Sequence, residues 1–154
     1  MIIGVVGSEA AKFTPETQAE ARRVIRQLIA GASLVVSGHS PLGGIDWWAI
    51  EEAKQLDIPT LEFPPIPVRG RMSWLLSFKP RNLRIATASD MVICITVKQL
   101  PVGYTGRRFG SCYHCQRYAP HFGGSATIEH VKSGGCWTMW QAAHMGKQTQ
   151  LEVI

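Results

Sequence analysis

The chain contains no apolar run that approaches the roughly 20 residues needed to cross a bilayer as a helix. Its first residues also lack the basic region and the long apolar stretch of a secretory signal, so we interpret Ile2–Val6 as a core strand and expect a cytoplasmic protein. Charged residues make up only 18% of the chain and hydrophobic residues 45%, which excludes a disordered composition. The 154 residues therefore suit one ordinary globular domain, 1–154.

Acidic residues are outnumbered by basic ones, 11 against 16, and the formal net charge is +5. The excess is concentrated in two stretches of the chain. Clustered positive charge suits phosphate groups, on a small ligand or on nucleic acid, although each basic residue can equally belong to a solvated face. One cluster holds Lys98, Arg107, Arg108, Arg117 and Lys132 against the single acid Glu129, and the other holds Arg69, Arg71, Lys79, Arg81 and Arg84.

Apolar segments of strand length alternate with amphipathic segments of helix length along the chain. Strands that are apolar throughout and separated by helices predict a parallel sheet covered on both faces. We therefore predict an α/β fold: a Rossmann-like, doubly wound, mainly parallel five-stranded sheet with a long insert at 97–131 before the last helix. The predicted strands are 2–6, 34–36, 59–63, 91–96 and 149–153, and the predicted helices start at Thr14-Pro15, Ile45, Pro80 and Gly135.

Three of the expected strand-to-helix turns are rich in glycine and hydroxyl residues. A doubly wound sheet binds ligands beyond the carboxyl ends of its strands, where the winding reverses. Glycines there let main-chain amides approach an anion, and a helix N-terminus adds a favourable partial charge. None of the turns matches the dinucleotide or P-loop fingerprint. The candidate phosphate-binding residues in them are Gly7, Ser8, Gly38, His39, Ser40, Gly43, Gly44, Asp46, Ser133, Gly134, Gly135 and Thr138.

Four segments of the chain resemble the SLOG superfamily, which includes the LOG proteins, DprA and the YspA/YpsA-like proteins. These segments are Gly7-Ser8, 36–46, 79–90 and 133–138, and they frame nearly the whole chain except about 97–131. The resemblance implies a Rossmann-like fold that binds a nucleotide or nucleotide-derived ligand, with Arg81 and Asn82 at the site, and a homodimer. A guanidinium can hold a phosphate through two hydrogen bonds, although Arg81 can instead pair with a carboxylate.

The resemblance leaves the activity open. It suggests a LOG-like nucleoside monophosphate phosphoribohydrolase, which cleaves an N-glycosidic bond, but the position of the LOG catalytic glutamate is Gln141. An amide side chain cannot ionise and cannot act as a general base. Arg81 and Asp46 are the remaining catalytic candidates. The alternative function is a DprA-like nucleic-acid-binding module that uses the same turns for backbone phosphates.

The insert at 97–131 has little periodicity, and a structureless loop of that length is improbable in a compact domain. Cys112 and Cys115 have the spacing of a zinc knuckle, and zinc would need two more Cys or His ligands. We predict a structural zinc site formed by Cys112, Cys115, His130 and Cys136. Metal binding would supply folding free energy that the insert cannot obtain from a core, and the insert would then act as a lid.

Other interpretations of these cysteines remain open. His121 or His114 can take the place of Cys136, which also lies in a predicted phosphate-binding turn. The pair Cys112 and Cys115 can form a redox dithiol or a disulfide, or the cysteines can be unliganded. Cys94, in the middle of a predicted strand, is expected to pack in the core.

Overall fold

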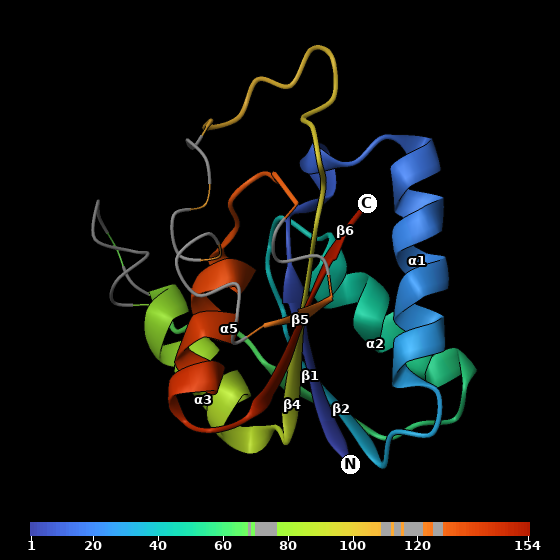
Figure 1. The fold of residues 1–154 in the computed structure, drawn as a ribbon, viewed down its shortest axis with the longest axis vertical. Coiled ribbons are helices and arrows are strands. Elements are labelled where there is room, and N and C mark those ends of the chain that lie inside the picture. Colours follow the sequence, from blue (N-terminus) through green and yellow to red (C-terminus); the bar gives the residue numbers. More distant parts are fainter. Residues whose placement is uncertain (68, 70–76, 109–111, 113–114, 116–121, 125–127) are drawn as a thin grey trace.

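The computed structural model describes residues 1–67, 69, 77–108, 112, 115, 122–124 and 128–154. In these residues the strands form one sheet in the order β3-β2-β1-β4-β6-β5 (Figure 1), and every pair of neighbours is parallel. The predicted α/β class with a parallel sheet is confirmed. The strands are β1 (Ile2–Gly7), β2 (Leu34–Gly38), β3 (Thr60–Phe63), β4 (Met91–Thr96), β5 (Gly123–Gly124) and β6 (Gln148–Val153).

The sheet has six strands, so the predicted number of five was wrong. The additional strand, β5, lies inside the insert and pairs only Gly123 and Gly124 with β6. Two glycines have no side chains and therefore show neither the alternation nor the β-branched residues by which a strand is predicted.

Helices cover both faces of the sheet (Figure 1). The helices α1 (Pro15–Ile29) and α2 (Ile45–Gln55) lie on one face, and α3 (Lys79–Ala88) and α5 (Gly134–His144) lie on the other. Alternate residues of β4 enter different cores: Ile93 packs with α1 and α2, and Cys94 packs with α3 and α5. A strand buried on both faces is apolar throughout, as the sequence indicated. Among the described residues no helix is long and apolar enough to cross a membrane.

The sheet reverses its winding at β1. From β1 the chain proceeds through β2 to β3 on one side, and it then returns to β4 on the other side of β1. The carboxyl ends of β1 and β4 are joined by a buried hydrogen bond of 2.8 Å between the hydroxyls of Ser8 and Thr96. This end of the sheet is the place where a ligand site is expected in a doubly wound fold.

The predicted start of α1 is confirmed by its capping interactions. Thr14 Oγ1 accepts a hydrogen bond from the Thr17 amide at 3.2 Å, and Thr17 Oγ1 accepts one from the Thr14 amide at 2.8 Å. Pro15 occupies the first helical position, where its missing N–H costs no hydrogen bond. Between β1 and this cap, a single turn of 3-10 helix, η1 (Ala10–Lys12), directs the chain across the end of the sheet.

We predict that Thr14→Ala lowers the free energy of unfolding by about 1 kcal/mol, because it removes the acceptor for one amide at the helix start. Urea unfolding followed by circular dichroism measures this change. Thr14→Ser keeps the hydroxyl and should remain close to wild type. Equal stability of the Ala and Ser variants would show that the cap contributes nothing measurable.

Candidate functional site

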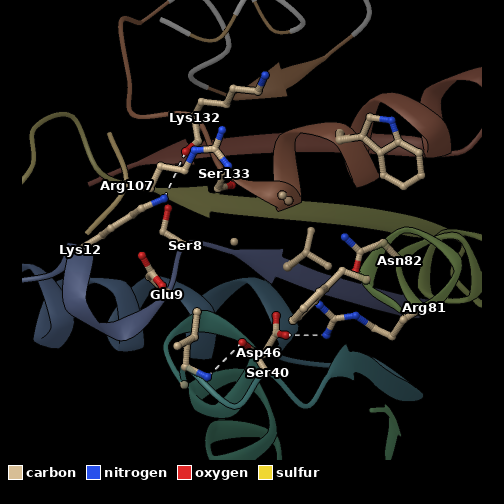
Figure 2. Close-up of a pocket in the computed structure, with 18 of the residues that line it drawn as sticks. Ser8, Glu9, Lys12, Ser40, Asp46, Arg81, Asn82, Arg107, Lys132 and Ser133 are labelled. Atoms are coloured by element: carbon tan, nitrogen blue, oxygen red, sulfur yellow. Dashed lines mark hydrogen bonds and ion pairs between the residues drawn. The ribbon is translucent and has the colours of Figure 1, made fainter. Parts of the chain in front are cut away.

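A cavity of about 730 Å³ opens at the carboxyl end of β1 (Figure 2). Its volume lies within the range of small-molecule sites in proteins. Its walls come from the end of β1, η1, the turn before α2, the start of α3, the insert and the start of α5. The cavity therefore occupies the point where the winding of the sheet reverses.

The cavity brings together most of the residues singled out in the glycine-rich turns and the Arg81 segment, although they are far apart in the sequence. Their role in binding a ligand stays a prediction. The predicted residues that line the cavity are Gly7, Ser8, Ser40, Gly43, Asp46, Arg81, Asn82, Ser133, Gly134 and Gly135.

The other predicted residues, Gly38, His39, Gly44 and Thr138, are not among the lining residues. His39 is exposed, and its Nδ1 lies 2.8 Å from Glu62 Oε2. The Thr138 hydroxyl donates to the Gly134 carbonyl oxygen at 3.0 Å, so it is satisfied within α5.

Glycine is required where the turns approach one another. A Cβ added to Gly135 would lie 2.8 Å from the Gly7 nitrogen, and one added to Gly44 would lie 2.4 Å from the Ser8 carbonyl oxygen. Gly44 also has a φ of 86°, a conformation that side chains disfavour. The Gly7-Ser8 turn is consequently held between the first turns of α2 and α5, with main chain packed on main chain.

One end of the cavity is cationic. Figure 2 shows Lys12 and Arg107 next to Ser8 and Ser133, and Lys132 beside them with its side chain directed away from Ser8. The Lys12 ammonium is buried and donates to the Lys132 carbonyl oxygen at 3.3 Å. Burial lowers the pKa of Lys12, against the opposing attraction of Glu9. The complete lining carries five cationic side chains and two carboxylates, a net charge of +3.

The sequence analysis did not identify all of these charged residues. Lys79, Arg107 and Lys132 belong to the two basic clusters but were not selected individually. Glu9 and Lys12 were missed altogether. Lys12 is a single base before the first helix, and no local pattern indicates that its side chain turns into a cavity.

The other end of the cavity contains a buried ion pair. Arg81 Nη1 lies 2.8 Å from Asp46 Oδ2, and the two side chains are only 7% and 8% exposed. Burial raises the pKa of Asp46, while the attraction of Arg81 opposes that rise. Arg81 therefore pairs with a carboxylate, which is one of the two roles that the sequence left open. The pair is buried. Arg81 Nε and Asn82 Oδ1 are buried without a hydrogen-bond partner among the described residues.

The insert reaches the rim of the cavity through Tyr104. The Tyr104 hydroxyl donates to Glu9 Oε1 at 2.7 Å, and burial together with this bond raises the pKa of Tyr104 to about 12. Gly106 and Arg107, which follow in the chain, line the cavity. The insert thus contributes directly to the wall of the site.

A second group of interest lies beside the start of α5. The side chains of Cys112, Cys115, His130 and Cys136 are all buried, and one potential ligand atom from each lies within 4.8 Å of the others. The predicted set of four therefore meets in space, and such a group can bind a metal ion. The alternatives His114 and His121 lie outside the described residues, and all four cysteines of the chain are free thiols.

The environment of the four side chains suits metal ligands. His130 Nδ1 lies 2.6 Å from the Ile128 carbonyl oxygen, so it carries the proton, while the buried Nε2 has no partner among the described residues. This is the tautomer that metal-binding histidines adopt. Hydrogen bonds from Cys112 and Cys115 lower the pKa of Cys136 well below its usual value, which favours a thiolate.

Cys94 is the remaining cysteine and lies in the core beneath the start of α5, as predicted. Its Sγ is 3.8 Å from Ser133 Oγ, which is in turn 3.7 Å from Cys136 Sγ. Cys94 is not a member of the group of four.

We predict that Arg81→Met lowers the free energy of unfolding by about 3 kcal/mol, because it leaves Asp46 buried and unpaired. Adding Asp46→Asn should restore part of that loss. Chemical denaturation of the single and double variants measures both effects, and Arg23→Met, which breaks the exposed pair with Glu20, is the control. A double variant less stable than Arg81→Met would contradict this account of the pair.

The sequence matches no known family profile and no curated protein. The fold, in contrast, has counterparts among solved structures. The molybdenum cofactor carrier protein of Chlamydomonas reinhardtii is 16% identical and superposes with a TM-score of 0.57 over 97% of this chain and 74% of its own. DprA of Streptococcus pneumoniae is 18% identical, with a TM-score of 0.48 over 96% of this chain and 57% of its own.

The likeness to the carrier protein is a likeness of fold. It supports the Rossmann-like α/β architecture that the sequence predicted. At this level of identity it assigns no ligand and no reaction to this chain.

Proposed function

We propose that the cavity binds a small phosphate-bearing ligand derived from a nucleotide. The observation that carries this proposal is the concentration of Lys12, Arg107 and Lys132 at one end of a 730 Å³ cavity. The first turn of α5 faces the same end, and no side-chain hydrogen bond from Ser133 caps it. Main-chain amides at a helix N-terminus and adjacent cations together favour a phosphate.

The remainder of the ligand would extend toward Asp46, Arg81 and Asn82. The Arg81 Nε donor and the Asn82 Oδ1 acceptor have no partner among the described residues, and polar groups of a base or sugar would satisfy them. Trp137 and Phe78 add apolar surface beside this end. A cavity with one anion-binding end and one mixed end fits a nucleotide better than it fits a simple anion.

Binding without turnover is the form of the proposal that the residues support best. Gln141, at the position of the LOG catalytic glutamate, is not among the lining residues. Asp46 is engaged by Arg81 and is therefore poorly placed to accept a proton. A protein of this fold is named for carrying a molybdenum cofactor, which agrees with a carrier or sensor role.

We predict that Lys12→Met and Lys132→Met each weaken the binding of adenosine 5′-monophosphate on the order of ten-fold, because each removes a charge-assisted contact with phosphate. Isothermal titration calorimetry measures the affinity. Adenosine should bind far more weakly than the monophosphate to the wild type. Lys54→Met, which removes an exposed charge from α2, is the matched control and should bind normally.

Inorganic phosphate tests the anion site without assuming a base. It should compete with the monophosphate in the wild type and compete less well in the two lysine variants. Failure of both probes to bind the wild type would refute the proposal. If single-stranded DNA binds instead, with a steep loss of affinity as salt rises, the nucleic-acid-binding alternative holds. Native mass spectrometry of the purified protein would also report a retained nucleotide and the predicted homodimer.

We further propose that Cys112, Cys115, His130 and Cys136 bind one zinc ion. Three thiolates and an imidazole are a common tetrahedral zinc set, and zinc–sulfur bonds of 2.3 Å place neighbouring sulfurs about 3.8 Å apart. Ligand atoms that already lie within 4.8 Å of one another need little movement to reach that geometry. The role is structural, because all four positions come from protein and none is left for a substrate.

We predict that the purified wild type carries one zinc ion per chain and that Cys112→Ser loses it. Because zinc binding contributes to folding free energy, the variant should also unfold at a lower temperature, as should the wild type treated with a chelator. Elemental analysis and thermal scans measure the two effects. Cys94→Ala removes a buried thiol outside the group and should retain the metal; full zinc occupancy in Cys112→Ser would contradict the assignment.

A further inference from the structure

Two of the four candidate metal ligands enclose one wall of the cavity. His130 and Cys136 stand on either side of residues 131–135, and four of those five residues, Lys132, Ser133, Gly134 and Gly135, line the cavity. We propose that metal coordination by His130 and Cys136 fixes the position of this phosphate-binding loop. Zinc and the phosphate ligand would then each strengthen the binding of the other. This proposal rests on the proposed function of the cavity.

Hydrogen bonds to its main chain attach the loop to the end of β4 at its first residue. The Val131 amide donates to the Val97 carbonyl oxygen at 2.9 Å, and Thr96 Oγ1 donates to the Val131 carbonyl oxygen at 2.6 Å. Beyond this point the main chain turns away from β4 to begin α5. A metal bound to both His130 and Cys136 would fix the two ends of the loop relative to each other, and so would set the direction in which its amides point.

A direct contact connects the loop to the metal group. Ser133 Oγ lies 3.7 Å from Cys136 Sγ, and Ser133 also lines the cavity. A hydroxyl that donates to a metal-bound thiolate orients that ligand. The same hydroxyl thus faces the metal ligand on one side and borders the anion site on the other.

The other two ligands connect the metal group to the insert, which also lines the cavity. Cys112 and Cys115 belong to the insert, and Arg107 lies a few residues before them and lines the cationic end. Three cationic side chains that converge at one end of the cavity repel one another. Metal coordination offsets that repulsion by holding the segments that carry them, and a bound phosphate relieves it. Because both favour the same arrangement of the 131–135 loop and the cations beside it, their binding is linked, and such linkage is reciprocal.

We expect zinc removal to loosen the loop while the centre of the sheet stays intact. Amide hydrogen exchange, measured by mass spectrometry, should become faster in peptides covering 131–136 when the wild type is stripped of zinc. Peptides from β1 and β4 should exchange as before. Cys112→Ser should reproduce the effect, although Cys112 does not line the cavity. Unchanged exchange at 131–136 would overturn the proposal.

The linkage itself is measured as a change in how tightly the protein retains zinc when the monophosphate is bound. Zinc-loaded wild type is titrated with a competing chelator, with and without saturating adenosine 5′-monophosphate, and the monophosphate should tighten zinc retention on the order of ten-fold. This measurement remains valid if the stripped protein unfolds, because it starts from the folded, loaded form. Equal retention with bound monophosphate would refute the linkage and leave the proposed function standing. Absence of monophosphate and phosphate binding to the loaded protein would instead refute the proposed function.

Discussion

The site depends on the close approach of two main-chain segments, the end of β1 and the first turn of α5. Gly7 and Gly135 meet without side chains, and a Cβ on Gly135 would come within 2.8 Å of the Gly7 nitrogen. This approach places the amide end of α5 directly over the point where the sheet reverses its winding. If Gly135 carried a side chain, the helix would have to move outward, and the cavity between the β1 turn and the α5 turn would lose its shape. A Cβ on Gly7 would instead come within 2.1 Å of the Ile95 carbonyl oxygen of β4.

The remainder of the site consists of charged side chains around the contact between Gly7 and Gly135. Lys12, Arg107 and Lys132 come from η1, the insert and the loop before α5, three segments that no regular hydrogen-bonded ladder joins. The Lys12 contact with the Lys132 carbonyl oxygen and the Tyr104 contact with Glu9 connect these segments locally. The group of three cysteines and one histidine lies behind them, where a bound metal would oppose the mutual repulsion of the cations. The proposed anion site and the proposed metal site therefore share the segment from His130 to Cys136.

Much of the fold and part of the site could be predicted from the sequence. The strands were recognisable because burial on both faces leaves β4 with Ile93 on one side and Cys94 on the other, and no polar alternation. The grouping of Cys112, Cys115, His130 and Cys136 could be predicted because the spacing of Cys112 and Cys115 is typical of metal ligands and because a long insert without periodicity needs an interaction that orders it. The glycine-rich turns could be predicted because two main-chain segments can approach this closely only where a residue has no Cβ, and glycine is the residue that lacks one.

Other features could not be predicted because they depend on the three-dimensional arrangement alone. Lys12 donates to a carbonyl 120 residues further along the chain, and nothing near it in the sequence marks that partner. The choice of Asp46 as the partner of Arg81 likewise spans 35 residues. The strand β5 consists of two glycines and carries no pattern.

The central claim is that the cavity at the β1–α5 contact binds a phosphate group. A crystal structure of the zinc-loaded protein with adenosine 5′-monophosphate tests it most directly. The account predicts that the phosphate lies between the Gly7-Ser8 turn and the Ser133–Gly135 turn, within hydrogen-bond distance of Lys12 or Lys132. A phosphate bound elsewhere on the molecule, with this cavity holding only solvent, would contradict it.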